Sequence, residues 1–227
     1  MTDKRLLCVA SLVREGASLA DIGTDHAYLP VYLMQEGRIR AAIAADIGEG
    51  PAASARQHIR EAALDEAIAV RVCDGLVGIA PDEVTDIVIA GMGGETIIHI
   101  LSEAPWVRDA RYRLVLQPMT KTVELRRWLY DNGFTVTEEH LIPDGRHLYN
   151  VMAAEFAAAS PAADPLMPYI GALSAKEGLP YFQRQLETLQ KRIGGMKLAG
   201  NTAEVAALEE LYAALTRYID TAKEREA

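Results

Sequence analysis

Short apolar runs alternate with amphipathic segments along the first two thirds of the chain. The runs at 18–22, 41–46, 68–72, 86–90 and 112–117 have the length and composition of buried strands. Segments at 27–36, 50–63, 94–103 and 121–131 have helical spacing, and residues 5–14 predict a leading helix. Strands that alternate with helices in this way predict an α/β domain built on a parallel sheet.

Two further strands are predicted at 134–142 and 149–155, and they are connected differently. Residues 143–146 are Pro-Asp-Gly-Arg, a turn sequence that is too short for a helical crossover. We therefore expect these two strands to run antiparallel, so that five parallel strands end in an antiparallel hairpin.

The pattern becomes helical after residues 157–165, an Ala- and Pro-rich stretch that we interpret as a hinge. Apolar residues then recur at steps of three and four in two series, 179–193 and 205–219, with Gly194-Gly195 and Gly200-Asn201 expected to break the run between them. This spacing predicts an antiparallel coiled-coil hairpin of two helices. The predicted domains are residues 1–158 and 165–227.

The two arms of this hairpin carry opposite charge. Residues 179–198 hold four basic residues and one acid, whereas residues 199–227 hold three basic residues and six acids. One interpretation is charge pairing between the arms, which contributes little per pair. The other is that the first arm offers its basic side chains to a phosphate backbone.

A cluster of small or acidic residues follows each of the first four predicted strands. Because the carboxyl ends of parallel strands meet at the ligand-binding edge of a sheet, we expect these clusters to form one cofactor site. In chain order they comprise Asp21, Gly23, Thr24, Asp25 and His26; Asp46 and Ile47; Cys73, Asp74 and Gly75; and Ala90, Gly91, Met92 and Gly93.

The first cluster indicates which cofactor this edge holds. A dinucleotide fingerprint needs three glycines as G-x-G-x-x-G, whereas Gly23 is followed by Thr-Asp-His-Ala-Tyr. A diphosphate would meet the carboxylate of Asp25, so a cofactor without phosphates and with a positive centre fits better. We therefore expect S-adenosylmethionine, a sulfonium. Asp46, 25 residues after Asp21, is expected to bind its ribose, and residues 73–75 its adenine.

Composition and charge limit the possible classes. Half of the residues are hydrophobic, which suffices for a packed core, and the net charge of −9 argues against a general nucleic-acid binder. No run of 18 apolar residues and no leader is present, so we expect no membrane association. Cys8 and Cys73 have no metal-ligand spacing, so we expect free thiols, no bound metal and a cytoplasmic location.

Several motifs together resemble those of the bacterial tRNA (adenine-22-N1)-methyltransferases. They are A-D-I-G-T-D-H-A-Y-L-P, C-D-G-L, I-A-G-M-G-G, L-V-L-Q-P-M and L-R-R-W-L-Y-D-N-G-F, and the resemblance covers essentially the whole chain. It implies a class I methyltransferase fold, which is a Rossmann-like, mostly parallel sheet with an antiparallel last strand. It also implies methyl transfer from S-adenosylmethionine to N1 of adenine 22 in the D-arm region of tRNA, with the C-terminal hairpin helping to hold the tRNA.

Methylation at N1 assigns roles to a few residues. The N1 lone pair attacks without losing a proton, so alignment matters more than a strong base. Asp25 is the predicted catalytic residue, because a carboxylate that accepts the N6–H would stabilise the positive charge on the adenine; the alternative is that Asp25 only caps the following helix. We expect His26 to position groups beside the cofactor, Tyr28 to stack on the target adenine and Met119 to line the base pocket.

Other residues are expected to be structural, and other functions stay open. The histidines His58, His99 and His140 are isolated in sequence, and Trp106 and Trp128 are expected to pack. A methyltransferase that acts on another RNA or on a small molecule would share every cofactor motif. A non-catalytic nucleotide-binding scaffold, with the hairpin as its dimerisation element, is the other alternative. The sequence predicts no oligomeric state.

Overall fold

The computed structural model describes residues 2–145, 147–158, 164–199 and 202–224, and the chain divides into two compact units, Met1–Ser160 and Pro161–Ala227. The strands of the first unit are β1 (Ala17–Ile22), β2 (Ile39–Asp46), β3 (Ile68–Val72), β4 (Asp86–Gly93), β5 (Arg113–Thr120), β6 (Phe134–Asp144) and β7 (His147–Phe156). Its helices are α1 (Lys4–Leu12), α2 (Tyr28–Gln35), α3 (Glu49–Glu61), α4 (Gly94–Ser102) and α5 (Thr122–Asp131), with a short 3-10 helix at Pro105–Val107.

The seven strands form one sheet in the order β3-β2-β1-β4-β5-β7-β6. Strand β1 pairs in parallel with β2 and β4, and β4 pairs in parallel with β5. Strand β7 is antiparallel to both of its neighbours, β5 and β6. The predicted sheet is therefore confirmed: it is Rossmann-like and mostly parallel, with an antiparallel last strand.

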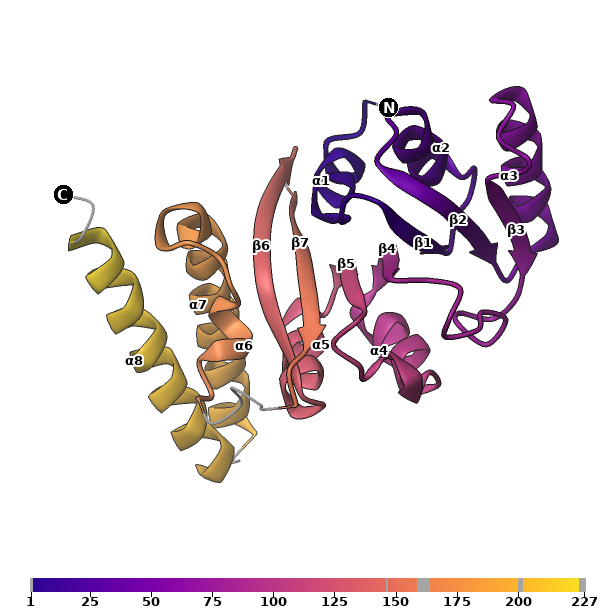
Figure 1. Cartoon of the computed structure of the whole chain (residues 1–227). Helices are drawn as coiled ribbons and strands as arrows, with labels where there is room; N and C mark the ends of the chain where they lie inside the picture. The colour runs from indigo at the N-terminus through magenta and orange to yellow at the C-terminus, as the bar shows by residue number, and fades with distance from the viewer. Residues whose placement is uncertain (1, 146, 159–163, 200–201, 225–227) are drawn as a thin grey trace. The chain divides into compact units, whose positions relative to one another are not determined.

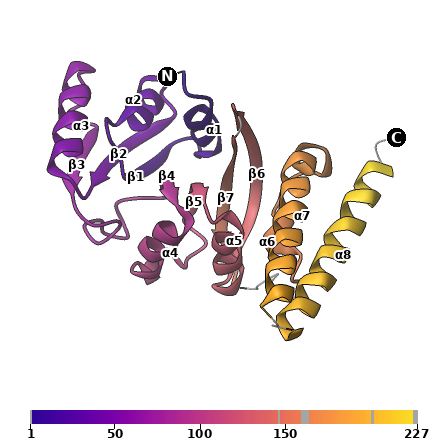
Figure 2. The ribbon, with the colours of Figure 1, turned by 180° about the vertical axis from the view of Figure 1, so that it is seen from behind.

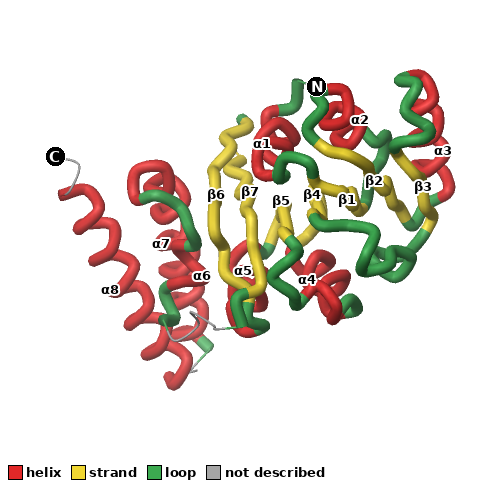
Figure 3. The backbone as a smooth tube through the Cα atoms, in the orientation of Figure 1, coloured by secondary structure: helices red, strands yellow, loops and turns green. Residues whose placement is uncertain are grey.

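Helices cover both faces of this sheet. Helices α1, α2 and α3 lie on one face, and α4 and α5 lie on the other (Figures 1 and 3). All six residues of β1 are buried as a result. This double cover explains why the strands are continuous apolar runs rather than alternating ones.

The second unit consists of α6 (Met167–Ile170), α7 (Ala175–Leu198) and α8 (Thr202–Glu224). The last two helices run side by side (Figure 2), and Leu189 and Leu215 are buried in this unit. The expected break at Gly194-Gly195 is wrong, because α7 continues through both glycines to Leu198. Packing between two long helices outweighs the roughly 1 kcal/mol that each glycine costs a helix. Gly200 and Asn201 lie outside the described residues.

Two further properties bear on the sequence-based expectations. None of the described helices is long and apolar enough to cross a membrane. Cys8 and Cys73 form no disulfide bond within the described residues, and each is partly buried.

Candidate active site

The strand registers bring the predicted clusters to one edge of the sheet. Ile22 at the end of β1 is paired with Ala45 of β2 and with Ile89 of β4, so the turn after β1 lies between Asp46 and Ala90. Strand order reverses between β1 and β4, and ligands bind in the crevice at such a switch point. The topology therefore places the first, second and fourth clusters around one crevice.

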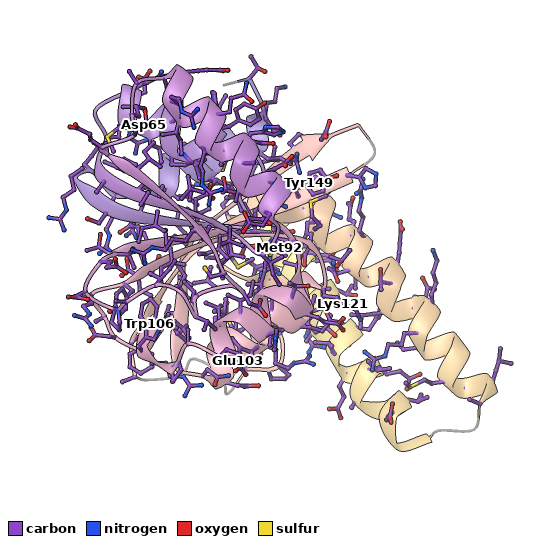
Figure 4. The ribbon with its side chains drawn as sticks, turned by 90° about the vertical axis from the view of Figure 1, so that its right-hand side faces the viewer. Asp65, Met92, Glu103, Trp106, Lys121 and Tyr149 are labelled. Carbon is purple, nitrogen blue, oxygen red and sulfur yellow. The ribbon has the colours of Figure 1, made fainter. Side chains whose placement is uncertain are left out.

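The turn after β1 is shaped by a glycine. Gly23 has a φ of +77°, and the N–H groups of Gly23 and Thr24 both donate to the carbonyl oxygen of Ala45, at 2.8 and 3.1 Å. A Cβ atom at Gly23 would lie 2.0 Å from Cε of Met92. Only glycine fits here without strain, because the backbone is left-handed and the Met92 side chain covers it. In Figure 4, Met92 lies between the layer that contains α3 and the layer that contains α4.

Two buried side chains stabilise this turn from inside. Asp21 is 7 % exposed and Thr24 is 5 % exposed. Burial raises the pKa of Asp21 to about 6, and the hydrogen bond with the Thr24 side chain acts in the opposite direction. The Thr24 hydroxyl also accepts the N–H of Ala27 at 3.0 Å, just before α2. It is therefore the threonine, and not the neighbouring Asp25, that satisfies a backbone donor at the start of this helix.

Asp25 projects away from this buried pair. Its carboxylate is 76 % exposed, and its Oδ2 atom lies 3.3 Å from Nε2 of His26. The His26 carbonyl oxygen accepts a hydrogen bond from Nδ1 of His58 at 2.8 Å. The half-exposed ring of Tyr28 contacts both imidazoles, with ring centroids 5.1 Å from His26 and 4.9 Å from His58. His58, which is isolated in the sequence, thus holds the backbone of the turn after β1, and its 32-residue separation from His26 left no local signal for this contact.

The second and third clusters meet at the ends of β2 and β3. The Asp46 carboxylate accepts the N–H of Gly48 at 2.7 Å through Oδ1, and the Cys73 N–H donates to the Asp46 carbonyl at 3.0 Å. Ile47 is 70 % exposed, which is unusual for a residue that follows a buried strand. The Cys73 thiol lies 3.6 Å from the carbonyl oxygen of Gly75. Asp74, between these two residues, is exposed.

The fourth cluster is held by a residue that the sequence analysis did not single out. Gly91 also has a φ of +77°, and its N–H donates to Oε1 of Gln117 at 3.1 Å. Gln117 is 2 % exposed. Gly93 precedes α4, whose first residue is Gly94, and a Cβ atom at Gly94 would lie 2.6 Å from the carbonyl oxygen of Lys121. A polar residue inside the apolar run of β5 was the available signal for Gln117.

Met119 lies at the end of β5 and is 39 % exposed. Its sulfur atom lies 3.5 Å from Nη1 of Arg5, whose guanidinium also covers the ring of Tyr149 at 5.1 Å. Arg5 in turn pairs with the carboxylate of Asp3 at 2.8 Å. The sequence analysis missed Arg5 and Tyr149, because they come from opposite ends of the first unit.

Both tryptophans pack against other aromatic rings of the first unit. Trp106 contacts Tyr112 edge-on at 5.0 Å, and it lies well away from Met92 in Figure 4. The ring of Trp128 lies against Phe134 at 6.1 Å.

The charges at this edge of the sheet indicate whether it favours a cationic or an anionic ligand. Its four clusters contribute the carboxylates of Asp21, Asp25, Asp46 and Asp74 and no lysine or arginine. Such an edge attracts a positively charged ligand and repels a phosphate. Among the described residues, no group of three His, Cys, Asp or Glu side chains is placed to hold a metal ion.

Comparison with known proteins agrees with this geometry. Residues 2–152 match the family model described as a methyltransferase domain. The tRNA (adenine(22)-N(1))-methyltransferase of Bacillus subtilis is 40% identical over 152 residues, which span 67% of this chain and 64% of that enzyme. The crystal structure of the m1A22 tRNA methyltransferase TrmK of B. subtilis is 31% identical, covers 99% of this chain and 98% of its own, and superposes with a TM-score of 0.78.

The chain belongs to the bacterial tRNA (adenine-22-N1)-methyltransferase family. A further member of this group of structures is Sp1610 of Streptococcus pneumoniae in complex with S-adenosyl-L-methionine. It is 35% identical, covers 96% of this chain and 100% of its own, and has a TM-score of 0.77.

Proposed function

We propose that this chain transfers a methyl group from S-adenosylmethionine to N1 of the adenine at position 22, in the D-arm region of tRNA. The observation that carries the proposal is the turn after β1, at the switch point of the sheet. In this turn Gly23 packs against Met92, and the carboxylate of Asp25 follows two residues later. The names of the B. subtilis and S. pneumoniae relatives support the same reaction.

The residues of this edge fit the cofactor. The left-handed turns at Gly23 and Gly91 bring the backbone close to the crevice, and a Cβ atom at Gly91 would meet nothing within 4 Å. Oδ2 of Asp46 forms no hydrogen bond with the described residues, so it is available to a ribose hydroxyl, and the exposed side chain of Ile47 offers an apolar surface to an adenine ring. When bound, S-adenosylmethionine supplies an electrophilic methyl group on a sulfonium. The remaining assigned contacts are Asp21, Thr24, His26, Cys73, Asp74, Gly75, Ala90, Met92 and Gly93.

The catalytic role falls to Asp25. Adenine N1 needs no base, but positive charge develops on the ring during methylation. An exposed carboxylate that accepts the N6–H of the adenine stabilises that charge, and the base itself excludes water from it on binding. His26 orients Asp25 through the 3.3 Å contact, and His58 holds the backbone of His26. Tyr28 supplies a ring for stacking, and Met119 lines the base pocket.

The second unit supplies positive charge for tRNA. Lys197 of α7 pairs with Glu209 of α8 at 2.7 Å, whereas Arg184, Lys191 and Arg192 are exposed and form no ion pair within the described part of this unit. Arg184 and Lys191 are seven residues apart and share one face of α7, and Arg192 follows about 100° further around the helix, so the three cations form a broad basic stripe. Charge pairing between the arms therefore accounts for one of the four basic residues within 179–198, and three remain for a phosphate backbone. The proposed action on tRNA would take place in the cytoplasm, which is the location we propose.

The test is methyl transfer from labelled S-adenosylmethionine to a pool of tRNA transcripts, followed by nucleoside analysis. We expect 1-methyladenosine, and we expect none from a transcript in which adenine 22 is replaced by guanine. Appearance of N6-methyladenosine, or equal labelling of the guanine transcript, would contradict the proposed position. A protein that is thermally stabilised by S-adenosylmethionine but modifies no tRNA would favour another substrate. A protein that the cofactor does not stabilise would favour a scaffold.

The role of the stripe is tested separately. Replacement of Arg184, Lys191 and Arg192 by alanine should weaken tRNA binding by roughly 10-fold or more at low salt, and it should flatten the salt dependence of binding. Lys197→Ala is the matched control, since this lysine is already paired with Glu209. Equal effects of the control and the triple variant would show that the stripe does not hold tRNA.

A further inference from the structure

A cavity outside the cofactor edge adjoins the predicted base-stacking residue. It has a volume of about 500 Å³ and lies between the start of α1 and the outer face of α2. These two helices are neighbours on the same face of the sheet (Figures 1 and 2). Leu6 and Val31 give it an apolar floor, and Tyr28, Tyr32, Gln35 and His58 surround it.

The walls of this cavity suit a flat, uncharged ligand. Tyr28 and Tyr32 offer ring faces, and the Tyr32 hydroxyl and the Gln35 amide can both donate and accept hydrogen bonds. The charged group on its lining is the carboxylate of Asp3, which pairs with Arg5 at 2.8 Å. No lysine or arginine is among its described lining residues, so the lining has no permanently cationic side chain to neutralise a phosphate. A nucleobase matches each of these properties.

The cavity is close to the reaction site but does not contain it. The ring of Tyr28 contacts His26, and His26 contacts Asp25, so these two rings separate the cavity from the catalytic carboxylate. From Tyr28 the cavity follows α2 to Gln35, seven residues or roughly 10 Å along the helix. None of the glycine turns assigned to the cofactor lines it. A base bound there is therefore a neighbour of the methylated base.

RNA chemistry supplies the reason for such a subsite. N1 lies on the edge of adenine that pairs within a helix, so the target base must leave its stack before a methyl donor can reach it. Its neighbour in the chain then loses a stacking partner, and an aromatic wall beside the active site replaces that partner.

We propose that this cavity binds the base of a nucleotide adjacent to the methylated adenine in tRNA. The inference rests on the proposed function and extends it, because it assigns a second base to the substrate site. The bound neighbour helps to hold the target adenine out of its helix.

Two variants test the subsite. Gln35→Trp fills the cavity from an exposed position, and Gln57→Trp, at an exposed position of α3 outside the cavity, is its matched control. Tyr32→Ala removes a ring face, and Tyr32→Phe keeps it. We expect Gln35→Trp and Tyr32→Ala to raise KM for tRNA by roughly 10-fold. Affinity for S-adenosylmethionine and the rate at saturating tRNA should stay within about 2-fold. Gln57→Trp and Tyr32→Phe should resemble the unmodified protein.

A direct readout uses tRNA with 2-aminopurine on one side or the other of the target adenine. Binding should change the fluorescence of one of the two probes, and Gln35→Trp should abolish that change. An unchanged KM for tRNA in both cavity variants would contradict the proposed subsite, and so would a loss of cofactor affinity as large as the rise in KM. Neither result would contradict the proposed methylation of tRNA. Free nucleosides that bind the cavity with no effect of Gln35→Trp on the KM for tRNA would also overturn it, in favour of a small-ligand site. Failure of the unmodified protein to methylate tRNA would instead refute the proposed function.

Discussion

Replacement of Gly23 by alanine tests whether the turn after β1 is as closely packed as the structure shows. Two separate penalties apply at this position. The backbone has a φ of +77°, and a new Cβ atom would lie 2.0 Å from Cε of Met92. Gly16 has a similar φ of +71° but nothing within 4 Å of its Cβ position. Gly16→Ala is therefore a control that carries the backbone penalty alone.

The two penalties can be estimated. A left-handed conformation costs a residue with a Cβ atom about 1–2 kcal/mol. Displacement of the Met92 side chain from its packed position adds about 1–3 kcal/mol, as in other overpacked sites. We therefore expect Gly16→Ala to lower the free energy of unfolding by about 1–2 kcal/mol, and Gly23→Ala by about 2–5 kcal/mol.

Urea unfolding followed by tryptophan fluorescence measures these differences, because Trp106 and Trp128 both belong to the first unit. Calorimetry with S-adenosylmethionine gives the second readout. Gly23→Ala should weaken the binding of S-adenosylmethionine at least roughly 10-fold, since the displaced Met92 side chain lies at the same edge of the sheet. Gly16→Ala should leave this affinity unchanged. The double variant Gly23→Ala/Met92→Ala should recover part of the lost stability.

Two results would refute this reasoning. Equal destabilisation by Gly16→Ala and Gly23→Ala would show that Met92 yields freely and that the close approach has no energetic consequence. Absence of any recovery in the double variant would show that the penalty at Gly23 arises elsewhere.

Three further substitutions test the site. Asp25→Asn should slow single-turnover methylation by roughly 10²–10³ at saturating cofactor, because it removes a preorganised charge and keeps the shape; a rate within a few-fold of the unmodified protein would exclude a catalytic role. Asp46→Ala should weaken the binding of S-adenosylmethionine by about 1–3 kcal/mol, measured by calorimetry, and an unchanged affinity would show that Asp46 does not belong to the site. Asp21→Asn should alter the pH dependence of stability. Burial favours the neutral acid of Asp21, so its stabilising contribution is complete below pH 4 and is lost as the pH rises through its pKa of about 6. Relative to the unmodified protein, the variant should gain about 3 kcal/mol between pH 4 and pH 8 in urea unfolding, and a pH-independent difference would contradict the raised pKa.

Much of the fold was predictable because its signals are local. Parallel strands buried on both faces are continuous apolar runs, and the short turn before His147 requires antiparallel pairing. The clusters at the strand ends were predictable for a related reason, since parallel strands must end at the same edge. Neither inference needs to know which strands are neighbours in the sheet.

The parts of the site that depend on neighbours were not predictable. His58 on α3 reaches the backbone of His26, and Arg5 on α1 covers Tyr149 on β7. These contacts join residues 32 and 144 positions apart, and periodicity along the chain contains no information about them. The hydrogen bond from the Thr24 hydroxyl to Asp21 is local, yet its effect on the Asp21 pKa depends on burial, which only the packed sheet produces.

The charge distribution then bears on how an acidic protein could carry out the proposed methylation of tRNA. Residues 1–156 carry 15 basic and 23 acidic residues, a net charge of −8, and the cofactor edge itself is acidic. That edge favours a sulfonium and repels the phosphates of the substrate, so affinity for tRNA cannot come from phosphate contacts at the reaction site. Base contacts and cations elsewhere must supply it. In the proposed complex, the aromatic cavity at Tyr32 contacts a base without charge, and Arg184, Lys191 and Arg192, which form no ion pair within the described part of the second unit, contact phosphates. Cofactor selection and substrate binding thus place opposite electrostatic demands on the chain, and residues far apart in the sequence meet them.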